Sequence, residues 1–241
     1  ANGSLELQGN ILIFGESLTL NGDGADVGAD TSGGALRNLS GSNIYNGAVT
    51  LGSASTIQSD AGTLSINGNI GGAFALTVEG AGNTTINGII GTGAGTLTKN
   101  DSGTLTLTSA NTYTGVTTIN GGTVTVTNAL GLGTVAGGAT VASGATLNIN
   151  GVTVAETPVT INGAGVGSAG ALTGTGVATL SGASVVLASN SSVGAATTTD
   201  ILTISGVISG GTNTLTKVGN GTVILSGTGA NTYTGLTTVE G

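Results

Sequence analysis

Short runs in which apolar and hydroxyl residues alternate recur along the chain. Two clear examples are TLTLT at residues 104–108 and TVTVT at residues 123–127. Successive side chains of a β-strand point to opposite faces, so the runs predict strands with Leu and Val inside and Thr outside. The same prediction covers Val223 and Leu225 in a later run. No stretch has a convincing helical period of 3.6 residues, and the pattern therefore predicts an all-β chain.

Asn-Gly and Gly-Gly pairs lie between these runs. Asn and Gly tolerate the positive φ angles of tight corners, so the pairs predict turns. Asn-Gly is also typical of antiparallel hairpins, which leaves a sandwich or a closed barrel as an alternative. The pairs are Asn67-Gly68, Asn87-Gly88, Asn120-Gly121-Gly122, Asn150-Gly151 and Asn162-Gly163.

Internal repetition favours a solenoid over that alternative. Residues 86–108 align without gaps on residues 204–226, and after a two-residue insertion residues 111–118 align on 231–238. A barrel has no reason to repeat in this way, whereas a solenoid adds equivalent coils along one axis. We predict that residues 1–241 form one continuous parallel β-helix segment of a longer solenoid, with repeat units near 86–127 and 204–241. At roughly 20 to 25 residues per coil it would have about eleven coils and a length of roughly 50 Å.

The repeat also fixes the positions of the tyrosines and lysines. Tyr45, Tyr113 and Tyr233 each lie in an Asn-x-Tyr-[Thr/Asn]-Gly pentapeptide. We expect this pentapeptide to form a corner in which Asn bonds the backbone and Tyr covers a gap between coils. Lys99 and Lys217 each follow Thr-Leu-Thr, and we expect them at equivalent exposed corners, where a charge discourages edge-to-edge association.

Residues 103–126, GTLTLTSANTYTGVTTINGGTVTV, resemble the passenger-associated repeats of bacterial autotransporters, and residues 221–241 resemble the first part of that repeat. The segments 34–41 and 57–64 are similar to connecting phrases of such passengers. The resemblance covers most of 33–127 and 201–241 and is weaker over 128–200. It implies an extracellular, right-handed, single-stranded parallel β-helix on the surface of a Gram-negative bacterium, secreted through a membrane β-barrel that we do not find in this sequence.

Composition removes most reaction classes. The 241 residues include no Cys, His, Met or Trp, and only 6% are charged. Thiol and imidazole nucleophiles, Ser-His-Asp relays and the usual zinc sites are therefore excluded. Glycoside hydrolysis would need two carboxyls across a cleft, and we nominate no such pair. We predict that the chain is not an enzyme, with no catalytic residues and no cofactor.

Charge narrows the possible partners. The formal net charge of −8 reflects three cations against eleven carboxylates. We expect no nucleic-acid partner, because phosphate binding needs Lys and Arg. Asp23, Asp26 and Asp30 lie in a Gly-rich stretch that faintly resembles calcium loops, but the spacing fits neither an EF-hand nor a nonapeptide calcium repeat. We prefer a solvated loop without a metal. Any link to a membrane would pass through the β-barrel absent from this sequence.

The preferred function is an extracellular structural rod that acts as a stalk, spacer or adhesive surface, with any host receptor unknown. The first alternative is a fibre that assembles head to tail. Neither terminus resembles a cap, and an uncovered terminal coil exposes unpaired backbone groups. A lesser alternative is ice binding through outward Thr rows, although the irregular spacing of the Thr-x-Thr phrases does not show the strict register that an ice face requires.

Overall fold

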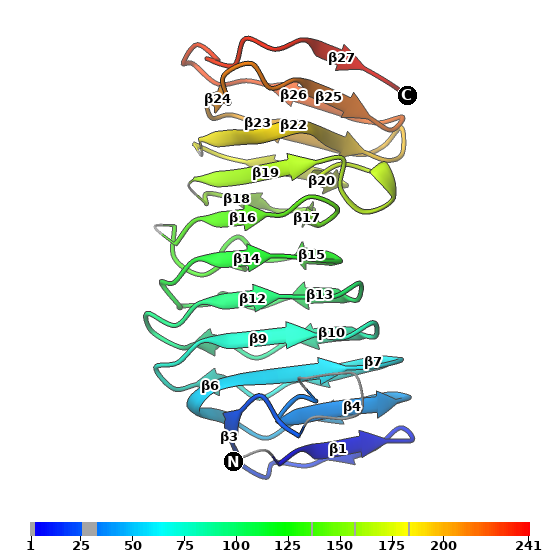
Figure 1. Ribbon diagram of the computed structural model, residues 1–241, viewed down its shortest axis with the longest axis vertical. Helices are drawn as coiled ribbons and strands as arrows, with labels where there is room; N and C mark the ends of the chain where they lie inside the picture. The colour runs from blue at the N-terminus through cyan, green and yellow to red at the C-terminus, as the bar shows by residue number, and fades with distance from the viewer. Residues whose placement is uncertain (1–2, 26–32, 136, 157, 183) are drawn as a thin grey trace.

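The computed structural model describes residues 3–25, 33–135, 137–156, 158–182 and 184–241. It forms an elongated stack of about 10 coils, with the two ends of the chain at opposite ends of the stack (Figure 1). Every strand pair that we identify in the described part is parallel, and each strand pairs with the coil before or after its own. The predicted all-β parallel β-helix is therefore confirmed.

Three strips of strands, which we call faces 1, 2 and 3, surround the core (Figure 1). Face 1 contains β2 (Leu12–Ile13), β5 (Ser42–Tyr45), β7 (Thr63–Ile66), β10 (Asn83–Ile86), β13 (Thr104–Leu107), β15 (Thr123–Val126), β17 (Thr146–Asn150), β20 (Leu172–Thr175), the second half of β22 (Val185–Ala195), β25 (Leu215–Val218) and β27 (Thr237–Val239).

Face 2 contains β1 (Leu5–Gln8), β4 (Leu36–Ser40), the second half of β6 (Val49–Ser59), β9 (Leu76–Glu79), β12 (Leu97–Lys99), β14 (Thr117–Ile119), β16 (Ala139–Val141), β19 (Val159–Gly163), the first half of β22 and β24 (Ile208–Ser209). Face 3 has two groups of strands. The first is β3 (Leu18–Gly22), the first half of β6, β8 (Ile70–Gly71) and β11 (Ile90–Gly91), and the second is β18 (Thr153–Val154), β21 (Val177–Leu180), β23 (Ile201–Ile204) and β26 (Thr222–Leu225).

The alternating runs place their apolar residues as predicted. Leu105 and Leu107 of β13 stack on Val124 and Val126 of β15, and all four are buried. The interleaved Thr residues of both strands are half-buried on the outer side. In β26, however, Val223 is only half-buried and Leu225 is 41% exposed. Both residues align with the buried Leu202 and Ile204 of β23, so they lie on the inward side as predicted, but Leu225 is not buried.

The reason for the exposure of Leu225 lies in the order of the strands. On its one side β26 pairs with β23, and within the described chain we find no strand paired on its other side. A side chain is buried in a solenoid only when coils cover it from both directions. Burial in the terminal coil thus depends on a neighbour and not on the period of the strand.

At two of the predicted Asn-Gly corners, glycine is required for a reason other than a positive φ angle. A Cβ atom on Gly68 would lie 1.8 Å from the carbonyl oxygen of Gly47, and one on Gly88 would lie 2.0 Å from that of Gly68. Neither glycine has a positive φ, unlike Gly122. Successive backbones approach too closely here for any side chain, so the requirement is for space between coils.

The two repeat units do not lie on the same faces. Lys99 is on face 2, between Val78 and Ile119, whereas Lys217 is on face 1, between Val193 and Val239. Strands β13 and β26 are likewise equivalent in sequence but belong to faces 1 and 3. The second unit is therefore rotated by one face, because the coils between the two units differ in length and their sum is not a whole number of turns.

Candidate functional site

Lys99 is buried, which corrects the expectation of an exposed corner. Its side chain is 1% exposed. Alternation along β12 places Lys99 on the same side as Leu97, inside the solenoid, and its Cα aligns with Val78 and Ile119 in the adjacent coils. The long stem can pack among these aliphatic side chains while the ammonium reaches the corner. The alternation of Leu97, Thr98 and Lys99 was the sequence signal for this position.

The ammonium group of Lys99 is held by backbone oxygens. Nζ donates to the carbonyl oxygen of Asn100 and, at 2.9 Å, to that of Asp101. Burial lowers the pKa of Lys99 to about 8, and the negative charges of Asp101 and Glu79 oppose that shift. Lys217 repeats the arrangement, since its Nζ donates to the carbonyl oxygen of Gly219. Lys217 is only half-buried, so the expectation of exposure is wrong for both lysines.

The Asn-x-Tyr-x-Gly corner joins three coils. Oδ1 of Asn111 accepts from the amide of Ile90 at 2.8 Å, and Nδ2 of Asn111 donates to the carbonyl oxygen of Gly131 at 2.6 Å. The hydroxyl groups of Tyr113 and Thr117 are 2.8 Å apart, and both residues are fully buried. Burial raises the pKa of the Tyr113 phenol above its usual value. The predicted bond from Asn to the backbone is confirmed, and the tyrosine fills the core.

The second copy of the corner repeats two of these contacts. Oδ1 of Asn231 accepts from the amide of Ile208 at 2.8 Å, and the hydroxyls of Tyr233 and Thr237 are 2.7 Å apart. The third copy keeps only the asparagine bond, in which Oδ1 of Asn43 accepts from the amide of Ile11 at 2.6 Å. Tyr45 lies within β5 and aligns with Ile66, in the column of strand residues that leads to Leu107, so the expected equivalent position of this tyrosine is wrong.

A buried carboxyl group, not anticipated from the sequence, lies near the first corner. Glu156 is 2% exposed, and its Oε1 accepts from the amide of Gly138 at 2.5 Å. Burial raises the pKa of Glu156 to about 7, while the hydrogen bond from Gly138 acts in the opposite direction. The sequence contains only a weak signal for this burial, because a single Glu after Val154 and Ala155 does not indicate an inward position.

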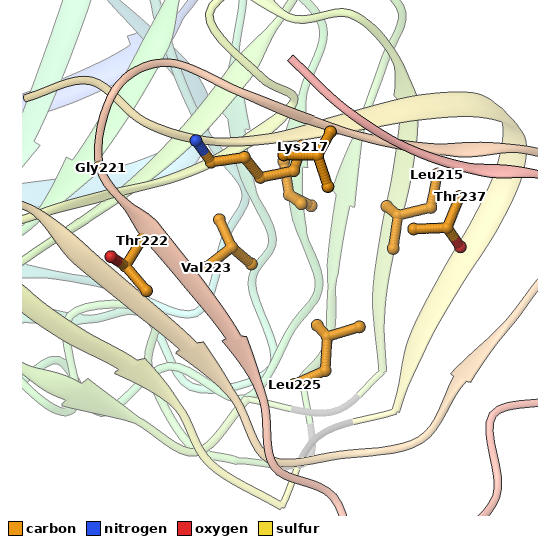
Figure 2. Close-up of a pocket in the computed structure, with 9 residues that line it drawn as sticks. Leu215, Lys217, Gly221, Thr222, Val223, Leu225 and Thr237 are labelled. Atoms are coloured by element: carbon orange, nitrogen blue, oxygen red, sulfur yellow. The ribbon is translucent and has the colours of Figure 1, made fainter. Parts of the chain in front are cut away.

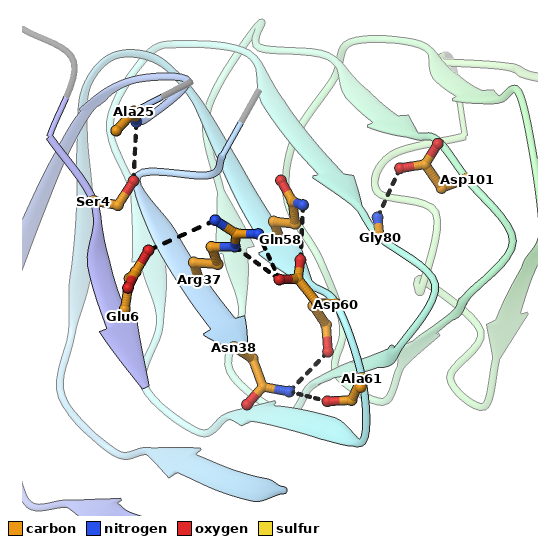
Figure 3. A network of polar contacts seen from close by, with 11 residues as sticks. Ser4, Glu6, Ala25, Arg37, Asn38, Gln58, Asp60, Ala61, Gly80 and Asp101 are labelled. Carbon is orange, nitrogen blue, oxygen red and sulfur yellow. Dashed lines mark hydrogen bonds and ion pairs between the residues drawn. The ribbon is translucent and has the colours of Figure 1, made fainter. Parts of the chain in front are cut away.

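Arg37 is at the centre of a polar network on face 2 (Figure 3). Its guanidinium contacts Asp60 through Nη2 at 2.6 Å and Nε at 2.9 Å, and Nη1 lies 3.6 Å from Glu6. Gln58 donates to the other oxygen of Asp60 at 2.8 Å. Lys99 and Lys217 donate to backbone carbonyl oxygens. All three cations of the chain lie in its described part, and each forms hydrogen bonds or ion pairs within the chain.

Hydroxyl side chains form regular columns on the outside. On face 1, Ser65, Thr85, Thr106 and Thr125 align from coil to coil. On face 2, a second column contains Thr77, Thr98, Thr118, Thr140 and Thr160. The irregular spacing of the Thr-x-Thr phrases in the sequence therefore conceals a strict register over several coils, because coils of unequal length vary in their corners and not in their strands.

The acidic stretch near the N-terminus is only partly described. Asp23 is exposed, while Asp26 and Asp30 lie outside the described residues. Within the described part, no three Asp or Glu side chains group closely enough to hold a metal ion. The expectation of a loop without calcium therefore rests on the sequence alone. No helix among the described residues combines the length and apolar character needed to cross a bilayer.

The last coil carries an open apolar groove of about 330 Å³ (Figure 2). Leu215, Val223, Leu225 and Val239 line it, together with Lys217. The repeat counterparts of Leu225 and Val239 are Leu107 and Ile119, which are fully buried one unit earlier. The groove is thus the interior of a coil seen from its uncovered side.

A family of known proteins shares the sequence segments that form these corners. The family model of the passenger-associated-transport-repeat matches residues 97–126 and 215–241, which include Lys99, Lys217 and both Tyr-Thr pairs. The "Adhesin BmaC autotransporter" of Brucella suis biovar 1 (strain 1330) is 34% identical over 179 residues. The match covers 72% of this chain and 5% of that relative's length. No solved structure matches. The chain belongs to the autotransporter passenger domains that carry passenger-associated transport repeats.

Proposed function

We propose that this chain is an extracellular structural rod of a surface protein of a Gram-negative bacterium, where it serves as a stalk and an adhesive surface. The main support is the uninterrupted stacking along face 2. Leu36, Ile57, Val78, Lys99, Ile119, Val141, Ile161 and Leu187 follow one another in register, and each is at most 1% exposed. A continuous column of this kind gives a stiff rod, because each coil is fixed by both neighbours.

A non-enzymatic role is supported by the use of the charged groups. Arg37 and Lys99 bond within the chain, and Glu156 bonds to the amide of Gly138. Asp200 accepts from the amides of Thr197 and Gly176, which lowers its pKa. These groups stabilise corners, which is a structural use of charge. The adhesive part of the proposal is supported by the relative named as an adhesin.

Surface display tests both parts. The chain is fused between a membrane anchor and an epitope tag on a Gram-negative host, and the height of the tag above the membrane is measured by electron tomography. Because each coil adds about 4.8 Å, about 10 coils should raise the tag by roughly 50 Å. Adhesion is measured separately with chain-coated beads on host cells and extracellular matrix. A tag at the height of the anchor alone contradicts the rod, and beads that adhere no better than uncoated beads contradict the adhesive role.

A head-to-tail fibre is the second candidate. It is favoured by the apolar groove of the last coil (Figure 2). Leu225 and Val239, which line this groove, are 41% and 76% exposed. Covering such a surface with another coil would bury it and pair the free backbone groups. Sedimentation should show species that grow with concentration, and Leu225→Lys should suppress them. A monomer at every concentration contradicts this candidate.

Ice binding is a lesser candidate, and it is favoured by the register of the Thr columns on faces 1 and 2. The test is thermal hysteresis of the purified chain. Thr106→Leu and Thr125→Leu should abolish any hysteresis, and its absence in the unmodified chain contradicts this candidate.

A further inference from the structure

The loop between β19 and β20 departs from the plain solenoid. It contains the short 3-10 helix η1 (Val166–Ser168), and it closes through a hydrogen bond from the amide of Gly170 to the carbonyl oxygen of Ala164 at 2.8 Å. Thr146 of β17 fastens it to face 1. The Thr146 hydroxyl accepts from the amide of Val166 at 2.9 Å and donates to the carbonyl oxygen of Gly170 at 2.9 Å. The loop is therefore a fixed wall above the strands.

A groove of about 270 Å³ lies between this wall and the strands of face 1. Its polar lining includes Thr123, Asn148, Thr173 and Thr175, which come from three successive strands of the face. Its apolar lining includes Val166, Ala169 and Ala196. This combination of an apolar wall with a few placed polar groups is typical of small-molecule sites. The volume is just below the about 300 to 1,000 Å³ of such sites, which suits one or two units of a longer ligand.

The polar groups leave hydrogen-bond donors available. The hydroxyls of Thr173 and Thr175 donate to Oδ1 of Asn148 at 3.0 and 3.1 Å. The Nδ2 group of Asn148 has no hydrogen-bond partner among the residues that the structure describes, although the residue is half-buried. An amide whose oxygen is occupied by two hydroxyls and whose two N–H donors are free is set to donate to acceptor oxygens of a ligand.

The charge of the site selects the class of ligand. None of the groove's lining residues is charged. The chain has a net charge of −8, and its three cations are held in the internal contacts of Arg37, Lys99 and Lys217. An acidic polysaccharide would be repelled, whereas a neutral, hydroxyl-rich molecule with apolar C–H faces meets both parts of the lining.

We propose that this groove binds a neutral oligosaccharide, with hydroxyl oxygens of one sugar unit on Asn148 and Thr123 and its C–H face against Val166 and Ala196. This inference rests on the adhesive part of the proposed function and names the ligand class for it. No pattern in the sequence indicates such a site, because residues 123, 148, 173 and 196 come together only through the stacking of coils.

The test uses the full 241-residue chain and immobilised neutral trisaccharides of glucose, mannose and galactose, with chondroitin sulfate as the acidic probe. At least one neutral probe should bind. Ala196→Trp, which fills the groove, and Asn148→Thr, which removes the amide, should each weaken binding by about tenfold or more. Thr125 and Thr173 lie on either side of Asn148 in the same column of the face. Asn148→Thr therefore introduces a residue type that neighbouring coils already have at this position, and the fold should tolerate it. Thr125→Val, one coil away and outside the groove, is the matched control and should bind normally.

Three results overturn the proposal: no neutral probe binds, both groove variants bind like the unmodified chain, or chondroitin sulfate binds better than every neutral probe. Melting curves of the variants separate loss of binding from loss of folding. The bead assay with the same variants separates the two proposals. If adhesion survives Ala196→Trp, the proposal for the groove is contradicted and the proposed adhesive function stands. If the unmodified chain does not adhere, the adhesive function itself is contradicted.

Discussion

The Nζ atom of Lys99 donates a hydrogen bond to the carbonyl oxygen of Asp101, 2.9 Å away, from a position inside the solenoid. The contact places a cation beneath a corner whose Asp101 has a φ of 57°. The Oδ2 atom of Asp101 in turn accepts from the amide of Gly80 in the preceding coil at 3.0 Å. A lysine in the core thus organises the corner in a chain that has only three cations.

The pH dependence of stability should report this lysine. Its pKa is about 8 in the folded chain, below the ordinary value of 10.5, so between these values the unfolded chain binds more protons. The free energy of unfolding should therefore rise from pH 8 to about pH 10, by about 1 to 2 kcal/mol after solvent screening is taken into account. Lys99→Met should remove the rise, and Thr98→Val, on the outer side of the same strand, should keep it. Denaturant titrations measure the slope, and an equal rise in Lys99→Met contradicts the assignment.

Glu156 should give the opposite slope at lower pH. Its pKa is about 7 when folded and 4.5 ordinarily, so the folded chain binds the proton more tightly. The contribution of Glu156 to stability is fully present below pH 4.5 and is lost as pH rises through about 7. Glu156→Gln keeps an acceptor for Gly138 and should flatten the curve, whereas the exposed Glu240→Gln should not. Thermal melts across this range measure the effect, and a sloping curve in Glu156→Gln argues against it.

Leu107→Ala should lower the free energy of unfolding by about 2 to 5 kcal/mol, because it leaves a cavity between closed coils. Leu225 is the equivalent residue of the second repeat but is 41% exposed, so Leu225→Ala should cost less than about 1 kcal/mol. Denaturant unfolding of the two variants gives the comparison. Equal losses would show that the last coil is covered in solution.

Asn111→Ala should leave the amide of Ile90 and the carbonyl of Gly131 without partners, at a cost of about 1 to 3 kcal/mol. Hydrogen exchange at the Ile90 amide should accelerate. Thr112→Ala, at the neighbouring exposed position, is the control and should leave that exchange rate unchanged. Unaltered protection of Ile90 in Asn111→Ala would mean that the asparagine does not join the coils.

The acidic stretch gives a prediction that rests on sequence alone. Since the spacing of Asp23, Asp26 and Asp30 fits no calcium loop, added calcium or chelator should not change the melting temperature. A calcium-dependent rise of several degrees that Asp26→Ala abolishes would instead identify a metal site.

The sequence by itself determined the strands and the side on which most residues lie. The period of two is a local property, so TLTLT at 104–108 and TVTVT at 123–127 required no tertiary information to place Leu107 and Val126 inside. Repetition in the sequence likewise predicted coils, because only a solenoid reuses one unit along an axis. The same period places Lys99 inside, but burying a charge usually costs free energy, so the sequence favours an exposed position. Only the structure shows that carbonyl oxygens at the corner accept from the ammonium group and offset that cost.

Only the tertiary structure decided what the coils bring together. The lengths of the intervening coils rotate the second repeat unit by one face, and that rotation depends on the sum of many corners. Close approach of backbones, and not φ, requires glycine at residues 68 and 88. The groove beneath the loop at 164–170 joins residues from successive coils. Such relationships depend on register between residues 20 or more positions apart, and register is fixed by backbone hydrogen bonds between coils and not by any local preference.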